Sequence, residues 1–151
     1  MAESSRSGRP APRMDHVGLA VADLDAAMNW YTTAFGYQAE FVNRIEAIDL
    51  DLVMLVHREH GDRLELLHRG GAAPARLDPK PTDPATAARI EGFGHVAFDV
   101  QDLDGSFERL VGLGARPVMS PGPSPVPGIR MAFVADPEGN LLELLERGAA
   151  A

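Results

Sequence analysis

The stretch Gly92-Phe93-Gly94-His95-Val96-Ala97-Phe98-Asp99-Val100 decides the fold, because it is the second copy of a pattern that occurs earlier in the chain. The first copy is Met14-Asp15-His16-Val17-Gly18-Leu19-Ala20-Val21. An Asp-Leu-Asp sequence follows each copy one residue later, beginning at Asp23 and at Asp102. The same order of residue types at two places indicates an internal repeat.

A second pair of similar stretches supports this repeat. The sequence Leu64-Glu65-Leu66-Leu67-His68-Arg69-Gly70-Gly71-Ala72 matches Leu142-Glu143-Leu144-Leu145-Glu146-Arg147-Gly148-Ala149-Ala150 at seven of nine positions. Two pairs of similar stretches, in the same order and with nearly the same separation in sequence, are typical of a tandem supersecondary unit. The chain is therefore predicted to contain two such units, each beginning with a strand histidine and ending with a strand glutamate.

Composition limits the classes of function. The chain has 151 residues, of which 45% are hydrophobic, and this predicts one domain with a core of ordinary size. It has no cysteine, which excludes disulfides, thiolate metal sites and cysteine nucleophiles. A net charge of -8, without a lysine and arginine cluster, argues against binding to nucleic acid or to an anionic membrane surface.

The two ends of the chain are expected to lie outside the domain. Residues 1–13 are small, polar and rich in proline, and they lack the apolar core of a signal peptide. We expect them to form a disordered tail, and residues 148–151 to form a second, short tail. No apolar run approaches the ~20 residues of a membrane span. These features favour a cytoplasmic protein.

The first unit, at about residues 14–70, is predicted to fold as a strand, a helix and three further strands. Residues 15–21 alternate too weakly in polarity for an exposed strand, so we expect this strand to be buried on both faces. Asp23 is a good helix N-cap residue and Gly36 a helix stop, with apolar residues at helical spacing between them. The further strands are predicted at residues 39–46, 48–56 and 63–68.

A connector at residues 71–91, with one or two helical turns near its end, leads to the second unit at about residues 92–147. The stretch 120–128 of that unit contains four prolines and two glycines, so we predict neither a helix nor a central strand there. It would form a rim or lid over a pocket, or an inert connector. The remaining elements repeat the plan of the first unit: a strand at 94–100, a helix at 102–111, and strands at 116–119, 129–135 and 140–146.

Four residues that recur in register across the repeat form the candidate site: His16, Glu65, His95 and Glu143. Each glutamate lies between leucines, where an unpaired buried charge is costly unless it is neutralised, paired or metal-bound. Taken singly, each residue also fits a core histidine or an edge glutamate. Their joint recurrence favours one pseudo-twofold site, in which two imidazoles and two carboxylates bind an octahedral divalent ion.

The residues around these positions resemble the vicinal oxygen chelate superfamily, which includes glyoxalase I, methylmalonyl-CoA epimerase, extradiol dioxygenases and the fosfomycin and bleomycin resistance proteins. The resemblance covers nearly the whole chain. It rests on Asp15-His16-Val17, on Gly94-His95-Val96-Ala97-Phe98, and on Asp136-Pro137-Glu138-Gly139-Asn140 before Leu142-Glu143-Leu144. It implies an α+β fold of tandem βαβββ modules, whose curved mixed sheet encloses a metal ion.

Within the superfamily, the full set of four ligands is most similar to glyoxalase I and differs from the epimerase set mainly at Glu65. The resemblance implies a metal-dependent lyase or isomerase that moves the proton α to a carbonyl of a hemithioacetal or thioester. Glu143 would be the base, with Glu65 on the opposite face of the substrate. The ion would be nickel, cobalt, manganese, zinc or iron, and the protein a homodimer that binds a small molecule.

Three questions stay open at this stage. In bacterial glyoxalase I two subunits exchange modules, whereas the long connector here is closer to the epimerase, in which one chain supplies all ligands. A natural-product-binding protein of the antibiotic-resistance type would keep the fold with the ligand set idle. An extradiol dioxygenase would need iron(II) and a dioxygen site, and Glu65 as a fourth ligand argues against it.

Other polar residues are weaker candidates. Glu46, Asp49 and Asp51 could supply a second acid or base, although surface charge explains them more simply. Arg130, beyond the proline-rich stretch, is hypothesised to contact an anionic group of the substrate. The remaining histidines are expected at the surface: His57, His60 and His68.

Overall fold

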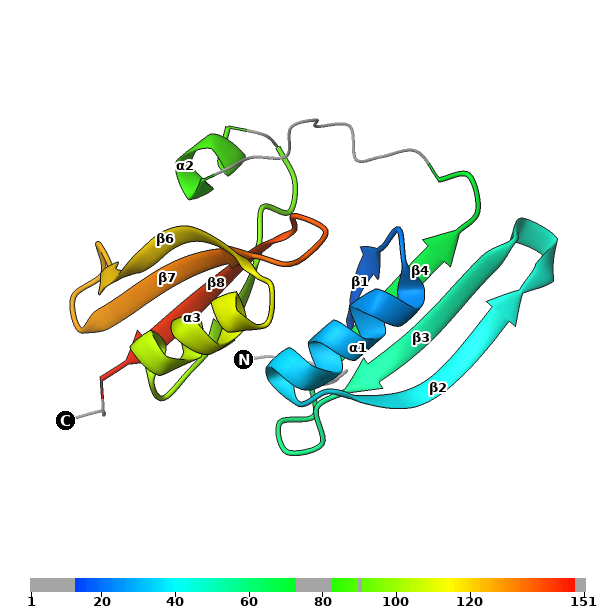
Figure 1. The fold of residues 1–151 in the computed structure, drawn as a ribbon, viewed down its shortest axis with the longest axis horizontal. Coiled ribbons are helices and arrows are strands. Elements are labelled where there is room, and N and C mark those ends of the chain that lie inside the picture. Colours follow the sequence, from blue (N-terminus) through cyan, green and yellow to red (C-terminus); the bar gives the residue numbers. More distant parts are fainter. Residues whose placement is uncertain (1–12, 73–82, 90, 149–151) are drawn as a thin grey trace, which may run out of the picture.

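The computed structural model describes residues 13–72, 83–89 and 91–148. Most of the predicted N-terminal tail, the central part of the connector and residues 149–151 lie outside the described residues. Figure 1 shows two modules side by side, each with its helix in front of its sheet. Both modules have the order strand, helix, strand, strand, strand, which confirms the predicted tandem α+β fold.

The elements of the first module are β1 (Val17–Ala20), α1 (Leu24–Phe35), β2 (Gln38–Ile45), the 3-10 turn η1 (Glu46–Ile48), β3 (Leu50–Val56) and β4 (Arg63–Arg69). The short helix α2 (Pro84–Ala87) precedes the second module. The second module contains β5 (Val96–Asp99), α3 (Leu103–Gly112), β6 (Arg116–Pro123), β7 (Ile129–Ala135) and β8 (Leu141–Arg147). None of the helices in the described ranges is long and apolar enough to cross a membrane.

Each module builds its own four-stranded mixed sheet, in the orders β1-β4-β3-β2 and β5-β8-β7-β6. The first and last strands of a module pair in parallel, and the other neighbours are antiparallel. The register places Gly18 opposite Glu65 and Ala97 opposite Glu143. Because side chains alternate between the two faces of a strand, the histidine two residues before each partner shares the face of the glutamate.

Helix α1 begins and ends where the sequence predicts. The Asp23 side chain accepts a hydrogen bond from the Ala26 backbone N–H at 2.9 Å, which satisfies one of the free donors of the first turn. Gly36 ends the helix with φ at 76°, a left-handed conformation that costs glycine little. The buried face of the helix consists of Ala27, Trp30, Tyr31 and Ala34.

The two modules share one hydrophobic core. Residues of α1, β3 and β4 in the first module form a single buried cluster with residues of α3, β7 and β8 in the second. Phe35 and Phe98 stack across the boundary with ring centroids 4.0 Å apart. The contact between the modules is therefore packed like the interior of a single domain, and this packing fixes the orientation of one module relative to the other.

Hydrogen bonds across the same boundary link specific groups of the two modules. The Tyr31 hydroxyl donates to the buried carboxylate of Asp136 at 2.8 Å, and the Trp30 indole N–H donates to the Leu113 carbonyl at 3.0 Å. The Glu138 carboxylate accepts hydrogen bonds from the backbone N–H groups of Ala22 and Asp23, just before α1. The turn between β7 and β8 is thus fastened to the start of the helix in the other module.

Three details differ from the sequence predictions. Residues of β1 are not buried on both faces: the edge strand alternates between half-buried and exposed side chains, because the part of the chain that the structure describes leaves its histidine face uncovered. Glu46 and Ile48, predicted as the end of one strand and the start of the next, belong to the turn η1 instead. Strand β6 extends to Pro123, beyond the predicted end at residue 119, and prolines are tolerated there because β6 is an edge strand.

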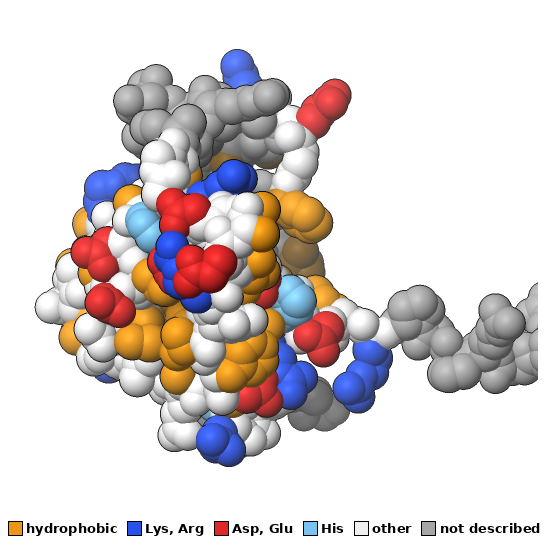
Figure 2. Space-filling view, turned by 90° about the vertical axis from the view of Figure 1, so that its right-hand side faces the viewer, with side chains coloured by type: hydrophobic (Ala, Val, Ile, Leu, Met, Phe, Trp, Pro, Cys, Tyr) orange, Lys and Arg blue, Asp and Glu red, His pale blue; other side chains and the backbone are white. Residues whose placement is uncertain are grey.

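Strand β2 is the other edge of the first sheet and is exposed along its whole length. Large apolar side chains remain accessible there, with Phe41 at 46% and Val42 at 69% exposure. Figure 2, which looks at the molecule from the side of this module, shows hydrophobic side chains interspersed with charged groups at the surface.

Removing the Tyr31 hydroxyl tests the link between the modules. We expect Tyr31→Phe to lower the free energy of unfolding by ~1–3 kcal/mol, because the buried Asp136 carboxylate loses one of its donors. Urea denaturation measures this change. The control Thr32→Val removes a hydroxyl from the exposed side of the same helix and is expected to change stability by less than ~0.5 kcal/mol. Equal effects of the two variants would contradict a special role for the Tyr31 hydroxyl.

Candidate functional site

The first candidate pair, His16 and Glu65, lies at the parallel contact of β1 and β4. The His16 Nε2 atom is 3.4 Å from Glu65 Oε2, and the two side chains are 35% and 20% exposed. Gly18 lies opposite Glu65 in the register, and a Cβ atom at Gly18 would be in ordinary contact with Glu65 Oε2, at 3.6 Å. The structure therefore brings together two of the four residues of the predicted site.

The second pair, His95 and Glu143, lies at the equivalent contact of β5 and β8. The His95 Nε2 atom is 3.0 Å from Glu143 Oε2, with side-chain exposures of 41% and 15%. The ring of Phe133 meets the His95 ring edge to face, with centroids 5.5 Å apart. Leu142 and Leu144 on either side of the glutamate point into the shared core, so this carboxylate lies at the border between core and solvent.

The two pairs do not meet within one chain. They lie on separate sheets, and the described residues contain no group of three or more histidine, cysteine, aspartate or glutamate side chains that could hold a metal ion. One copy of the chain therefore presents two equivalent half-sites, each with one imidazole and one carboxylate. Each half-site by itself supplies two of the four ligands in the predicted set.

The surroundings of His16 include a second carboxylate that the sequence did not single out as functional. Asp15 Oδ2 lies 2.9 Å from His16 Nδ1, and this hydrogen bond, with the charge of Glu65, raises the pKa of His16 above its ordinary value. The same bond lowers the pKa of Asp15. Arg63 lies 3.7 Å from Asp15 and forms an ion pair with Glu40 at 2.9 Å.

An apolar pocket of about 460 Å³ lies on the glutamate side of the second sheet. Phe133, which contacts His95, is part of its wall, and this links the pocket to the second half-site. The volume falls in the range of small-molecule sites, roughly 300–1,000 Å³. Pro125, from the proline-rich stretch, contributes to the wall. The other lining residues are Asp83, Pro84, Ala85, Val118, Met119 and Met131.

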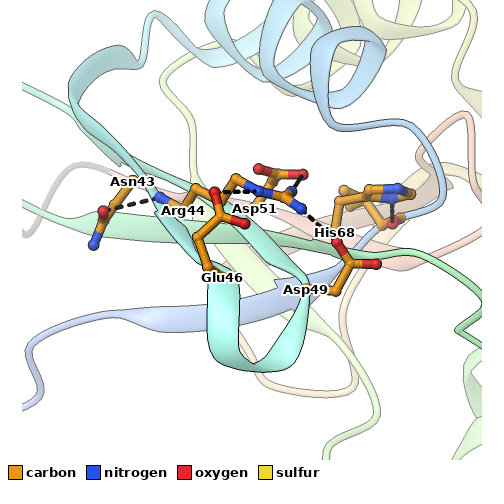
Figure 3. A network of polar contacts seen from close by, with 7 residues as sticks. Asn43, Arg44, Glu46, Asp49, Asp51 and His68 are labelled. Carbon is orange, nitrogen blue, oxygen red and sulfur yellow. Dashed lines mark hydrogen bonds and ion pairs between the residues drawn. The ribbon is translucent and has the colours of Figure 1, made fainter.

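The weaker acidic candidates belong to a surface network at the turn after β2. Arg44 pairs with Glu46, Asp49 and Asp51, at distances of 3.1, 2.5 and 2.7 Å (Figure 3). Asp49 has a φ of 52°, so the ion pair also helps to hold a left-handed turn. These carboxylates are engaged with one guanidinium, away from either histidine and glutamate pair.

Arg130 and the remaining histidines have local structural contacts. The Arg130 guanidinium donates to Asp104 at 2.8 Å and to Glu146 at 2.9 Å, which ties α3 to β7 and β8 rather than leaving the cation free for a substrate. His57 and His60 stack at the hairpin surface with centroids 4.3 Å apart. His68 is half-buried, and its Nδ1 atom lies 3.2 Å from the Val21 carbonyl oxygen.

Comparison with protein families and curated proteins gives consistent results. The model of the Glyoxalase/Bleomycin resistance protein/Dioxygenase superfamily matches residues 13–144. A protein of Vibrio parahaemolyticus named probable lactoylglutathione lyase is 27% identical over 140 residues, which cover 91% of this chain and 93% of the relative. A protein of Synechocystis with the same name is 25% identical over 87% of this chain and 92% of its own length.

Solved structures show the same fold. A glyoxalase family protein from Bacillus cereus superimposes with a TM-score of 0.73 at 22% identity, covering 95% of this chain and 99% of that protein. Glyoxalase I from Zea mays superimposes with a TM-score of 0.71 at 24% identity, covering 91% of this chain. The chain spans 46% of the maize protein, so its two modules correspond to about half of that polypeptide.

Filling the apolar pocket tests whether it accepts a ligand. We expect the uncharged fluorescent probe N-phenyl-1-naphthylamine to bind the protein, and Ala85→Trp to weaken binding at least ~10-fold because an indole occupies the cavity. Ala88→Trp places the same side chain on an exposed position outside the pocket wall and is the matched control. A fluorescence titration measures both variants. Equal affinity in the wild type and both variants would place the probe elsewhere.

Proposed function

Because the chain belongs to the Glyoxalase/Bleomycin resistance protein/Dioxygenase superfamily, we propose that it is a divalent-metal-dependent lyase or isomerase of the glyoxalase type. The reaction is the transfer of the proton α to the carbonyl of a hemithioacetal or thioester. One observation carries the proposal: the chain presents two equivalent pairs of an imidazole and a carboxylate, at 3.4 and 3.0 Å. The lactoylglutathione lyase names of its relatives support the hemithioacetal as the first substrate to test.

The complete site is formed by two copies of the chain. The shared core and the bond between Tyr31 and Asp136 hold the modules of one chain in an arrangement in which their half-sites stay apart. A two-fold symmetric dimer can oppose the first half-site of one copy to the second half-site of the other, and the symmetry then creates two identical sites. His16 and Glu65 of one copy would share each site with His95 and Glu143 of the other.

The donor atoms fit a divalent ion. Each half-site turns an imidazole Nε2 and a carboxylate oxygen toward the same place, and two half-sites supply two nitrogen and two oxygen donors. Such a set suits nickel, cobalt, manganese, zinc or iron. A bound ion supplies Lewis-acid stabilisation to the oxygen of the substrate as negative charge develops there.

The carboxylates of the chain move the proton. Glu143 is the better base, because its side chain is only 15% exposed and lies against the apolar wall formed by Phe133. It takes the proton from the carbon next to the carbonyl, and its protonated carboxyl group then returns the proton to the substrate, which regenerates the carboxylate. Glu65, from the other copy, would be the corresponding acid–base group on the opposite face of the substrate.

The apolar pocket receives the group attached to the carbonyl. Its wall begins at Phe133, which contacts His95 and lies opposite Glu143 in the sheet register. Apart from Asp83, the lining side chains are hydrocarbon or thioether. This wall favours substrates derived from aldehydes with an alkyl or aryl substituent over those with a charged substituent.

Mixing two defective variants tests whether the site is shared between copies. Glu65→Ala and Glu143→Ala each disable one half-site, and neither homodimer is expected to retain metal after dialysis. In a mixture that exchanges subunits, about half of the dimers are mixed, and each mixed dimer has one intact and one doubly defective site. Metal content is then expected to recover to about a quarter of the wild-type value, as measured by elemental analysis.

The control for this experiment mixes Glu65→Ala with His16→Ala. Both substitutions damage the same half-site, so no pairing of these subunits restores an intact site. A recovery that is equal in both mixtures, or absent from both, would contradict a site shared between copies. Metal retained by a separated monomer would place the site within one chain.

A second test addresses proton transfer. In the metal-loaded protein, Glu143→Gln is expected to lower the turnover of the hemithioacetal of phenylglyoxal and glutathione by roughly 10²- to 10⁴-fold, because the base is lost. Thioester formation is followed by absorbance. Glu108→Gln, an exposed position of α3, is the matched control and is expected to leave turnover unchanged. If the wild type binds no divalent ion and turns over no hemithioacetal, a natural-product-binding protein that uses the apolar pocket becomes the better account.

A further inference from the structure

The two histidines have the same position in the repeat but different hydrogen-bond partners. We propose that Asp15 is a positioning residue, which keeps the imidazole proton of His16 on Nδ1 and leaves Nε2 free as a ligand atom, whereas His95 has no acceptor of this kind beside its Nδ1 atom. The first half-site is then preset for a metal ion and the second is not. The preset tautomer stands on the geometry alone, and its consequence for metal binding rests on the proposed function.

The geometry of the first half-site determines where the proton lies. An ionised carboxylate accepts hydrogen bonds but cannot donate one, so a hydrogen bond between Asp15 and His16 requires the proton on Nδ1. The contact of Asp15 with Nδ1 is 2.9 Å, whereas that of Glu65 with Nε2 is 3.4 Å and therefore weaker. A neutral imidazole has one N–H, and it goes to the closer acceptor.

The second half-site lacks this arrangement. Gly94 precedes His95 in the chain, so no carboxylate stands where Asp15 stands in the first copy. The described residues provide no hydrogen-bond partner for His95 Nδ1, and Glu143 lies 3.0 Å from Nε2 as an ion-pair partner. No acceptor therefore holds the proton of neutral His95 on Nδ1, and Nε2 is not kept free for a metal ion.

Arg63 holds the Asp15 carboxylate in place. Its guanidinium lies 3.7 Å from Asp15 Oδ1 and is itself anchored to Glu40 through two hydrogen bonds, at 2.9 and 3.1 Å. This attraction acts on the oxygen that does not contact His16 and leaves Oδ2 for the imidazole. Asp15, which precedes β1, is thus linked to Arg63 of β4 and through it to Glu40 of β2.

The presence of a carboxylate beside the first histidine, and its absence beside the second, gives the two half-sites different roles. A carboxylate that holds the distal N–H of a ligand histidine orients the ring and increases its basicity, and loss of such a partner commonly lowers metal affinity 10- to 100-fold. The pair His16 and Glu65 is therefore the main anchor of the ion. The pair His95 and Glu143 is held less firmly, which suits a carboxylate that has to take up a proton during the reaction.

The first experiment determines both tautomers in the metal-free protein, from nitrogen-15 chemical shifts of the imidazole rings recorded at alkaline pH. The expected result is an Nδ1–H form for His16 and a different tautomer, or a mixture of tautomers, for His95. Asp15→Ala is expected to convert His16 to the Nε2–H form and to leave His95 unchanged. Asp15→Asn is expected to preserve the Nδ1–H form, because its amide oxygen still accepts.

The second experiment measures the nickel affinity of the same variants by competition with a chromophoric chelator. Asp15→Ala is expected to weaken binding roughly 10- to 100-fold, and Asp15→Asn by less. Asp25→Asn, at an exposed position of α1, removes the same charge without a contact to either histidine and is expected to leave the affinity unchanged.

Identical tautomers at His16 and His95, or an unchanged His16 tautomer in Asp15→Ala, would overturn the proposal. Equal losses of affinity in Asp15→Asn and Asp15→Ala would overturn the positioning role and leave only an effect of charge. The two tautomers could differ as expected while neither the wild type nor any variant binds nickel or another divalent ion. In that case Asp15 does fix the tautomer of His16, and the proposed metal-dependent function fails.

Discussion

The packing of helix α1 against the second module is the interaction on which the rest of the structure depends. Trp30 and Tyr31 of this helix contribute to a core that also contains residues of α3, β7 and β8, and the Tyr31 hydroxyl binds the buried carboxylate of Asp136. A buried carboxylate is stable only when its hydrogen bonds are satisfied, so this contact gives the interface a single geometry. That geometry keeps the two sheets separate and each histidine and glutamate pair at the surface of its own module.

The repeat produces two half-sites with the same backbone but different environments. In the first, Asp15 stands beside His16, and Arg63 and Glu40 stand behind Asp15. In the second, glycine precedes the histidine, and Phe133 lies against its ring beside an apolar pocket. A polar environment that orients a ligand and an apolar one that receives a substrate group are complementary requirements of a proton-transfer site. In the proposed dimer, each site would combine one half-site of each kind, and the two half-sites would then have different roles.

The sequence predicted the elements well wherever local chemistry decides them. The N-cap at Asp23 and the stop at Gly36 are both present. The prediction failed for the burial of β1, because weak alternation in polarity does not determine whether both faces of a strand are covered. It underestimated β6, because the number of prolines argues against a central strand but does not exclude an edge strand. No function was predicted for Asp15, because a carboxylate next to a histidine is typical of ordinary surface charge.

By itself, the sequence determined the repeat, the α+β class and the four residues of the candidate site, because duplication preserves residue type at equivalent positions and residue type sets the donor chemistry. Only the tertiary structure decided that the four residues form two pairs rather than one cluster within the chain. The long connector had favoured a site within one chain, yet connector length limits how far two modules can separate and not which faces they turn toward each other. That choice is made by the core around α1, and it depends on side-chain packing between residues far apart in the sequence.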